Sequence, residues 1–530
     1  MTHQSHHPSQ LVVFGDSLSD NGNLFDLIGL PPPPAWHGRA SNGPTYAEDL
    51  ARSLHMRLDD RAFAAAEASN ASPPVLVDPV TGHALPINLS DQIAGYLADL
   101  HGHRAPRCTT ALINIGSNDY SAFLQSPNPQ AIPALVHNVV GSIAQAIDAL
   151  THVGVDKIVL FTLPDFGITP AAQAQGPQAV ALAHALDLAN NAALAQMAAG
   201  HANVQLVDEF QLTEAIAADP HSFGFSASLN QTWVGQLAAG SHQFAPNEVG
   251  FFDAIHPTAA AHGIAAAFAD AVLTSDSTQF LDGTHNVIHA GRGDNFVFAT
   301  PVNPADPHLN DDYSIYGGSG ADIIFAGSGN VTVHGGSGND LIAAGSGNAM
   351  LDGDDGADVL ETNSAGTNRL AGGDGDDALI VNRAGTNTLL GCTGNDIFVL
   401  KESASAVNSN GSFNFGQQVV VGGSGHDTLR FIINDQNPAA ENALIAEFHK
   451  VEIAFELAAR HGHAGDFDVD GLHVTGIDRL ELQIDRVSSN PDTPYLITHD
   501  IASAEGHGAG VSPALSHLLQ TAEHWNLLTV

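Results

Sequence analysis

The sequence predicts two folded parts of different class: a three-layer α/β/α domain over residues 11–275 and an all-β stack of short repeats over residues 276–433. A chain of 530 residues is too long for one hydrophobic core. The first half alternates short apolar runs with longer amphipathic segments, which is typical of a parallel sheet with helices on both faces. The second half repeats a glycine-rich unit. We expect residues 1–10 to be a disordered tail and residues 434–530 to form a separate, β-rich C-terminal region.

The charge balance limits the possible partners. The formal net charge is −41, from 57 acidic and 16 basic residues. Nucleic acid and anionic membranes repel such a chain, so neither is expected as a partner, and cations are expected in the folded state. Cys108 and Cys392 fall in different predicted domains, so no disulfide framework is expected. No run of 18 apolar residues is present, so we expect no transmembrane helix.

Four short apolar runs are the predicted strands of the first domain, at 11–14, 110–115, 157–163 and 204–207. Between them, residues 132–150 carry apolar side chains at helical spacing, and residues 259–273 are an alanine-rich helix. The first strand ends at Gly15-Asp16-Ser17, where a turn into a helix presents the Ser17 hydroxyl at the carboxyl edge of the sheet. Ligands and reacting groups collect at this edge in open α/β sheets.

A serine hydroxyl acts as a nucleophile when a base and an oxyanion site lie beside it. Asp253 precedes His256 by three residues, so its carboxylate can accept the Nδ1 proton and leave Nε2 to take a proton from Ser17. Another apolar run ends near Asn118, whose amide can donate to a developing oxyanion, an interaction worth roughly 3–4 kcal/mol. A Gly-Asp-Ser alone is more often a polar turn. Three agreeing signals favour acyl transfer.

With these motifs the sequence resembles the GDSL, or SGNH, family of serine esterases and lipases. The resemblance covers residues 10–273 and rests on GDSLSDNGN at 15–23, GSND at 116–119, LPDFGITPA at 163–171 and DAIHP at 253–257. It implies a flavodoxin-like SGNH hydrolase fold. It also implies an enzyme whose substrate is a small-molecule or lipid ester and which needs no catalytic cofactor.

Carried over position by position, the resemblance makes Ser17 the nucleophile, His256 the base and Asp253 its orienting carboxylate. Asn118 and the backbone N–H of Ser17 become the oxyanion donors. The chain departs from the family's block, usually similar to N-Y-A-x-G-G-A, because residues 62–68 read AFAAAEA. Glu67 falls where the family has its oxyanion glycine, and a carboxylate there is unfavourable unless it points away.

After about residue 275 the sequence repeats every nine residues, as GGSGADIIF, AGSGNVTVH, GGSGNDLIA and AGSGNAMLD over 317–352. Each unit is a glycine turn and a short strand with an inward apolar residue, which must stack on its neighbours. A flexible linker would not fill the strand positions with Ile, Leu, Val and Phe. The pattern resembles the RTX, hemolysin-type nonapeptide repeat, whose fold is a parallel β-roll that binds calcium.

Aspartates recur 18 or 19 residues apart in the repeats, about once per coil, and are expected to stack along one edge. Carboxylates one strand spacing apart, about 4.8 Å, repel unless a hard cation lies between them. Carboxylate and carbonyl oxygens are the ligands that calcium prefers, so we predict structural Ca²⁺ here and hydrogen-bonded asparagine turns at the other edge. The predicted ligands are Asp322, Asp340, Asp358, Asp377, Asp396 and, after an insertion at 401–418, Asp427.

Proteins that carry this repeat use an uncleaved C-terminal signal for type I export. The residues before Leu11 leave no room for a cleavable secretory leader. We therefore expect leaderless secretion to the cell exterior, with type I export machinery as a partner and a signal within residues 434–530.

Three functions fit the sequence. The first is a secreted serine carboxylic-ester hydrolase that works through an acyl-enzyme, and it is favoured because all three triad positions are filled. The second is a calcium-dependent, adhesin-like surface-binding protein with an inactive hydrolase-like domain, which the Glu67 departure keeps open. The third is an acyltransferase that uses the same residues and passes the acyl group to an alcohol.

Overall fold

The structure is a computed structural model that describes residues 9–70, 76–77, 83–120, 129–225, 227–241, 244–281, 287–299, 313–383, 385–401, 416–434, 438–460, 465–486, 495–501 and 512–524. The chain forms two compact units. Unit 1 comprises Met1–Ala217, Ala227–Ser241 and Pro246–Leu273, and unit 2 comprises Ala218–Ser226, His242–Ala245 and Thr274–Val530. Most of the predicted tail, most of the insertion at 401–418 and residues 525–530 lie outside the described residues.

Unit 1 is built on a five-stranded parallel sheet of order β2-β1-β3-β4-β5. Its strands are β1 (Gln10–Gly15), β2 (Arg57–Asp60), β3 (Thr109–Asn114), β4 (Lys157–Phe161) and β5 (Val204–Val207). Four of them coincide with predicted strands. The sequence pattern does not predict β2, because this edge strand reads RLDD and none of its residues is buried.

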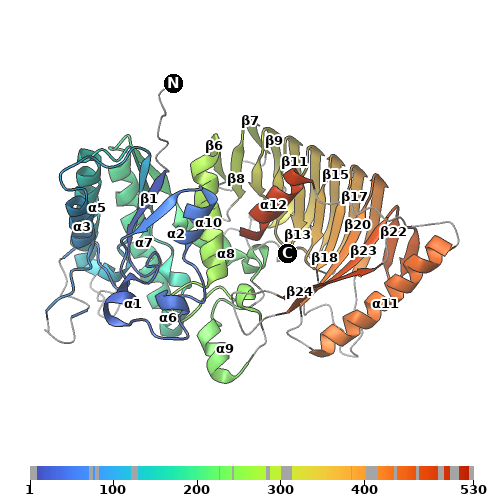
Figure 1. Ribbon diagram of the computed structural model, residues 1–530, viewed down its shortest axis with the longest axis horizontal. Helices are drawn as coiled ribbons and strands as arrows, with labels where there is room; N and C mark the ends of the chain where they lie inside the picture. The colour runs from blue at the N-terminus through green and yellow to red at the C-terminus, as the bar shows by residue number, and fades with distance from the viewer. Residues whose placement is uncertain are drawn as a thin grey trace. The chain divides into compact units, whose positions relative to one another are not determined.

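Helices cover both faces of this sheet (Figure 1). On one face α3 (Leu89–Asp99), α5 (Ile132–His152) and α7 (Pro177–Ala198) share a hydrophobic core with alternate strand residues. On the other face lie α2 (Tyr46–Ser53), α8 (Glu209–Ala218) and α10 (Ala259–Thr274), with the Tyr46 ring 5.0 Å from that of Phe161. The shorter helices are α1 (Asn23–Ile28), α6 (Pro170–Gln175) and α9 (Trp233–Ala239). The predicted three-layer α/β/α fold is confirmed.

Unit 2 contains a roll of two sheets that face each other across an apolar core, and up to residue 434 successive strands alternate between the sheets. The ten-stranded sheet contains β6 (Ser277–Leu281), β8 (Asn295–Ala299), β10 (Ile323–Phe325), β12 (Leu341–Ala344), β14 (Val359–Thr362), β16 (Ala378–Val381), β18 (Ile397–Lys401), β20 (Thr428–Asn434), β23 (Arg479–Arg486) and β24 (Tyr495–Ile501). The nine-stranded sheet contains β7 (Val287–Arg292), β9 (Tyr313–Ser319), β11 (Gly329–Ser337), β13 (Gly347–Asp355), β15 (Thr367–Asp374), β17 (Gly385–Thr393), β19 (Gly416–Ser424), β22 (Leu472–Thr475) and β21 (Phe467–Val469). The predicted parallel β-roll is confirmed.

The C-terminal region adds helices to the predicted strands. Helix α11 (Pro438–Arg460) follows β20 and places Phe448, Val451 and Phe455 in the apolar core of the roll. Strands β22 and β23 continue the parallel sheets, and each then pairs antiparallel with its last neighbour, β21 and β24. Helix α12 (Pro513–His524) contacts β14. Within the described part of the chain, no helix combines the length and apolar character needed to cross a membrane.

Candidate active site and calcium edge

The loop that carries Ser17 is held to the end of a fully buried strand. All six residues of β1 are buried, and Gln92 binds both backbone groups of Gly15, accepting from its N–H at 2.9 Å and donating to its carbonyl at 2.8 Å. A Cβ at Gly15 would lie 2.7 Å from the Asn114 carbonyl oxygen, so this close approach requires glycine. The turn that follows leaves Ser17 partly exposed at the carboxyl edge of the sheet.

The structure brings Ser17, His256 and Asp253 into one hydrogen-bonded chain. His256 Nε2 lies 3.0 Å from Ser17 Oγ, and His256 Nδ1 lies 2.8 Å from Asp253 Oδ2. The backbone N–H groups of Ile255 and His256 donate to Asp253 Oδ1, each at 2.8 Å, which orients the carboxylate. Burial alone would raise the pKa of Asp253, but its bonds to His256 and the backbone outweigh burial and hold the pKa below its ordinary value. An ionised Asp253 favours the tautomer with the proton on Nδ1.

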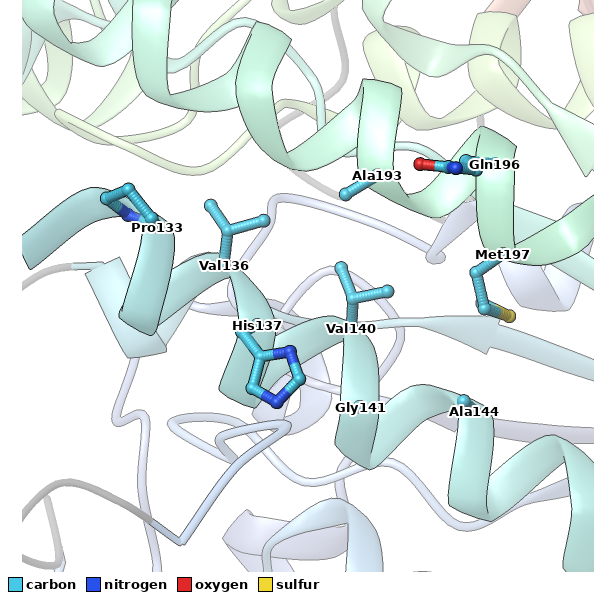
Figure 2. A pocket seen from close by; sticks show the side chains of 9 residues that line it. All are labelled: Pro133, Val136, His137, Val140, Gly141, Ala144, Ala193, Gln196 and Met197. Atoms are coloured by element: carbon cyan, nitrogen blue, oxygen red, sulfur yellow. The ribbon is translucent and has the colours of Figure 1, made fainter.

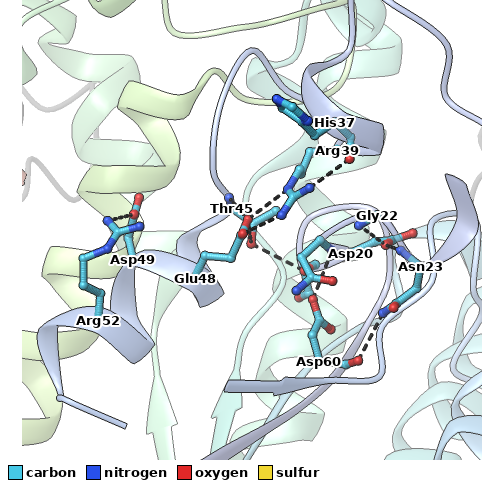
Figure 3. Close-up of polar contacts among 12 residues, drawn as sticks. Asp20, Gly22, Asn23, His37, Arg39, Thr45, Glu48, Asp49, Arg52 and Asp60 are labelled. Carbon is cyan, nitrogen blue, oxygen red and sulfur yellow. Dashed lines mark hydrogen bonds and ion pairs between the residues drawn. The ribbon is translucent and has the colours of Figure 1, made fainter. Parts of the chain in front are cut away.

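Asp20, to which the sequence assigned no role, organises the loop that carries Ser17 (Figure 3). Its Oδ1 accepts from the N–H groups of Gly22 at 2.8 Å and Asn23 at 2.6 Å. Its Oδ2 accepts from the N–H of Ala64 at 2.7 Å, which joins the loop to the segment 62–68. Asp20 lies inside the GDSLSDNGN motif, so the signal for it was present in the sequence.

Asn118 lies just after β3, and Asp119 beside it anchors the same segment. The Asn118 Nδ2 donates to the carbonyl of Ala66 at 2.8 Å, which orients the amide. Asp119 accepts from the N–H groups of Ala68 at 2.7 Å and Ser69 at 2.9 Å and from the Ser69 hydroxyl at 2.6 Å. The last two residues of GSND therefore tie the end of β3 to the segment that contains Glu67.

Glu67 is 2% exposed, although the sequence places it where a small residue is usual. Its Oε2 is buried without a hydrogen-bond partner among the described residues. Burial, reinforced by the charge of Asp119, raises the pKa of Glu67 to about 7. The side chain is therefore held largely as a neutral acid below that pH, and this form carries no charge that would oppose an oxyanion.

Two more carboxyl groups are buried around the loop that carries Ser17. Burial raises the pKa of Asp16 to about 7 and that of Glu209 to about 8. Asn114 Nδ2 donates to Glu209 Oε2 at 3.1 Å. Burial, together with the charge of His256, lowers the pKa of His262 to about 3, so His262 stays neutral. Burial near Ser17 thus favours the uncharged forms of Asp16, Glu209 and His262 by raising the pKa of the two carboxyl groups and lowering that of the imidazole.

A separate surface pocket of about 460 Å³ lies between α5 and α7 (Figure 2). Val136, Val140, Ala193 and Met197 form its apolar wall, with His137 beside them. Neither Ser17 nor His256 lines it, so this pocket is separate from the candidate active site.

In the roll, the six predicted calcium ligands share one arrangement. Along the edge each Oδ1 accepts from the backbone N–H of the preceding rung, as Asp340 Oδ1 does from Asp322 N at 2.8 Å. The second oxygen, Oδ2, is buried without a hydrogen-bond partner in all six: Asp322, Asp340, Asp358, Asp377, Asp396 and Asp427. Burial raises the pKa of each, to about 9 for Asp377, and the carboxylates of Asp358 and Asp396 on adjacent rungs add to that rise.

The unpaired Oδ2 atoms fit a calcium edge. They lie along the glycine turns, where a Cβ at Gly335 would come within 2.3 Å of Asp340 Oδ2 and within 2.8 Å of the Gly353 carbonyl oxygen. Carboxylate and carbonyl oxygens in this arrangement are the donor set of calcium. At the other edge asparagines bond to one another, as Asn348 Nδ2 does to Asn330 Oδ1 at 2.7 Å.

Comparison with known families agrees with both halves of the structure. Residues 11–268 match the family described as GDSL-like Lipase/Acylhydrolase, and residues 316–351 match the RTX calcium-binding nonapeptide repeat. The chain carries a GDSL-like acylhydrolase domain and RTX calcium-binding repeats. The GDSL domain corresponds to unit 1, and the RTX repeats form the middle of the roll.

Two curated relatives resemble the GDSL half. A phosphatidylcholine-sterol acyltransferase of Aeromonas hydrophila is 28% identical over 43% of this chain and 66% of its own length. A thermolabile hemolysin of Vibrio parahaemolyticus is 27% identical over 48% of this chain and 61% of its own length. The chain therefore spans about two thirds or less of these relatives. Among solved structures, the carbohydrate acetylesterase Est24 of Sinorhizobium meliloti matches with a TM-score of 0.24 and 16% identity, over 38% of this chain and 84% of its own.

Proposed function

We propose that the GDSL domain is a serine carboxylic-ester hydrolase whose nucleophile is Ser17. The observation that carries the proposal is the unbroken chain Ser17 Oγ, His256 and Asp253, with atom separations of 3.0 and 2.8 Å. These distances lie within the range for a nucleophile bonded to a base that is itself oriented by a carboxylate. The contact between these three groups favours a hydrolase over the inactive, adhesin-like alternative, which rests on the Glu67 departure rather than on a missing triad residue.

In the proposed mechanism, Ser17 Oγ attacks the ester carbonyl carbon while His256 Nε2 takes the hydroxyl proton. The carbonyl oxygen becomes an oxyanion that the Ser17 backbone N–H and the Asn118 amide stabilise. Breakdown of this intermediate breaks the bond to the leaving alcohol, which receives the proton from His256, and leaves an acyl group on Ser17. Water, activated by His256, then attacks the acyl-enzyme and releases the acid.

Transfer of the acyl group to an alcohol is the second candidate, and a relative named phosphatidylcholine-sterol acyltransferase favours it. The chemistry differs only in the acceptor that enters after the acyl-enzyme has formed. The names of the relatives, together with a relative called Lipase 1 from Photorhabdus luminescens, point to lipid esters as the substrate class. Incubating the protein with a lipid ester and an acceptor alcohol, and separating free acid from new ester, distinguishes the two reactions.

The test of the nucleophile compares wild type with Ser17→Ala in saturating calcium on nitrophenyl acetate, butyrate and palmitate. We expect the variant to lose at least about a thousandfold in kcat, because removal of a triad nucleophile leaves only binding and oxyanion stabilisation. Ser9→Ala, which changes a serine just before β1 and outside the proposed triad, is the control and should retain full activity. Equal rates for wild type and Ser17→Ala would contradict the assignment.

We also propose that Ca²⁺ occupies the edge formed by the six aspartates and stabilises the roll. Each ion would engage unpaired Oδ2 atoms and turn carbonyls and would favour the ionised aspartates. Calcium-dependent folding suits export through type I machinery, because a chain with net charge −41 repels itself where calcium is scarce. Secretion to a calcium-rich exterior would then supply the ligand that completes folding.

A further inference from the structure

The described part of unit 1 also contains a histidine and two carboxylates that converge outside the reaction site. Asp165 follows β4, His184 lies on α7 and Glu214 lies on α8. His184 Nδ1 is 3.1 Å from Asp165 Oδ2 and 3.9 Å from Glu214 Oε1. One ligand atom from each residue falls within a group no wider than 4.8 Å.

We propose that Asp165, His184 and Glu214 bind a divalent transition-metal ion of the Zn²⁺ type. Two ligands of a tetrahedral zinc ion, each bonded at 2.0–2.1 Å, lie about 3.3 Å apart. The distances from His184 Nδ1 to the Asp165 and Glu214 oxygens lie on either side of this value. Small movements of the His184 and Glu214 side chains would therefore bring the three ligand atoms to bonding distance from one ion. One imidazole and two carboxylates are a donor set that zinc accepts, whereas the calcium edge of the roll offers only oxygen.

The three proposed ligands differ in how far their side chains are buried and fixed in orientation. The Asp165 side chain is 5% exposed, and its other oxygen accepts from the Gly167 N–H at 2.7 Å, so its orientation is fixed. The side chains of Glu214 and His184 are 22% and 37% exposed, which leaves the fourth coordination position on the solvent side. Phe210 packs against the His184 ring at 5.3 Å and limits its rotation.

The charges around the group also favour a cation. Asp165 and Glu214 interact directly, and Asp187, which accepts from the Phe166 N–H at 2.9 Å, adds a third carboxyl group beside Asp165. Close carboxylates cannot all be ionised unless a cation offsets their repulsion. A divalent ion bound by these residues would supply two positive charges to offset that repulsion.

A metal bound here would connect three elements close to the loop that carries Asp253 and His256. It would join the end of β4 to α7 and α8, and the segment after Asp165 leads into α6, where the Ala171 N–H donates to the Ala254 carbonyl at 2.9 Å. Ala254 lies between Asp253 and His256, so the ion would fix the loop that carries both. This positional role rests on the proposed function, whereas binding of the ion does not.

The test is a titration of the full chain with Zn²⁺ in saturating Ca²⁺, against a chromophoric zinc chelator. The wild type should bind one Zn²⁺ ion at the proposed site tightly. His184→Gln and Glu214→Gln should each bind Zn²⁺ at this site at least tenfold more weakly, so that each variant has one fewer tight Zn²⁺ ion than the wild type. His334→Gln, which removes a histidine from the group His334, Asp352 and Asp354 in the roll, is the matched control and should titrate as the wild type does.

Two further readouts separate loss of the site from loss of the fold. Far-UV circular dichroism should be the same for all four proteins, and Co²⁺ should give visible absorption bands in wild type that both unit 1 variants lack. Identical zinc isotherms for wild type, His184→Gln and Glu214→Gln would overturn the proposal, as would loss of the tight Zn²⁺ ion in His334→Gln alone. None of these readouts depends on ester hydrolysis, so failure of the proposed function would leave them interpretable.

Discussion

The buried acids around Ser17 make the stability of the GDSL domain depend on pH. Asp16 and Glu209 have pKa values raised by burial to about 7 and about 8, while in an unfolded chain each ionises near its ordinary value. Between about pH 4 and these raised values the unfolded chain binds fewer protons than the folded one. The stability contribution of both groups is therefore greatest in acid and is lost as pH rises towards 7 and 8.

Replacing Glu209 tests this dependence. Glu209→Gln keeps the acceptor for the Asn114 amide and removes the proton, so at pH 8 the variant should be more stable than wild type by about 2–4 kcal/mol. At pH 5 the two should differ by less than about 1 kcal/mol. Calorimetry of the unit 1 transition in saturating calcium measures both, with Asp148→Asn, whose side chain is 75% exposed, as the control. A difference that does not grow with pH would contradict the prediction.

Local spacing made much of the candidate site predictable, and long-range burial made the rest unpredictable. Asp253 and His256 are three residues apart in one turn, which is closed by the bond from the His256 backbone N–H to Asp253 Oδ1. This short spacing was enough to predict that the carboxylate and the imidazole lie together. Glu209 lies 95 residues from its partner Asn114. Nothing in the sequence around either residue indicates that the fold buries them together.

Among the elements, the coils of the roll stack so closely that the turns have no room for a side chain at their left-handed glycines. Gly338 has φ of 128°, and a Cβ there would lie 1.9 Å from the Gly320 carbonyl oxygen on the neighbouring coil. The repeat period predicted these turns, because the same glycine recurs in every unit. The repeat period could not predict α11, because this helix follows the repeats. Its buried residues Phe448, Val451 and Phe455 are spaced three or four apart, as on one face of a helix.

Alanine at two glycines should have opposite effects. Gly338→Ala should destabilise the calcium-loaded roll by about 3 kcal/mol or more, because it combines a backbone clash with a left-handed conformation. Gly141→Ala, on α5 where a Cβ meets nothing within 4 Å, should stabilise unit 1 by about 0.5–1 kcal/mol. Thermal unfolding in calcium followed by circular dichroism measures both. An unchanged melting temperature of the roll in Gly338→Ala would show that the coils can separate.

At the scale of the whole molecule, calcium should distinguish the two units. The roll has six buried aspartates with an unpaired oxygen each, whereas the proposed triad uses no metal. Both halves were predictable in outline because motif and period are local, but the positions of α11 and α12 depend on contacts with the roll.

Chelation tests this separation. Excess chelator should abolish most of the β signal of the roll, while Ser17-dependent hydrolysis of a short nitrophenyl ester keeps at least about half of its rate, because separate units lose structure independently. Circular dichroism and hydrolysis are measured on one sample, and returning millimolar calcium should restore the signal. A circular dichroism spectrum that changes neither on adding chelator nor on returning calcium would contradict a calcium-stabilised roll.

The way the roll ends has a consequence for association between molecules. A stack of parallel coils exposes at its last rung both unpaired strand edges and the cross-section of its apolar core, which is a template for filament growth. Here β21 and β24 reverse the strand direction, and Phe448, Val451 and Phe455 of α11, which contacts β20 and β21, fill the core. The direction of the terminal strands does not match the first rung of another molecule. We therefore expect these terminal elements to oppose end-to-end polymerisation of the roll.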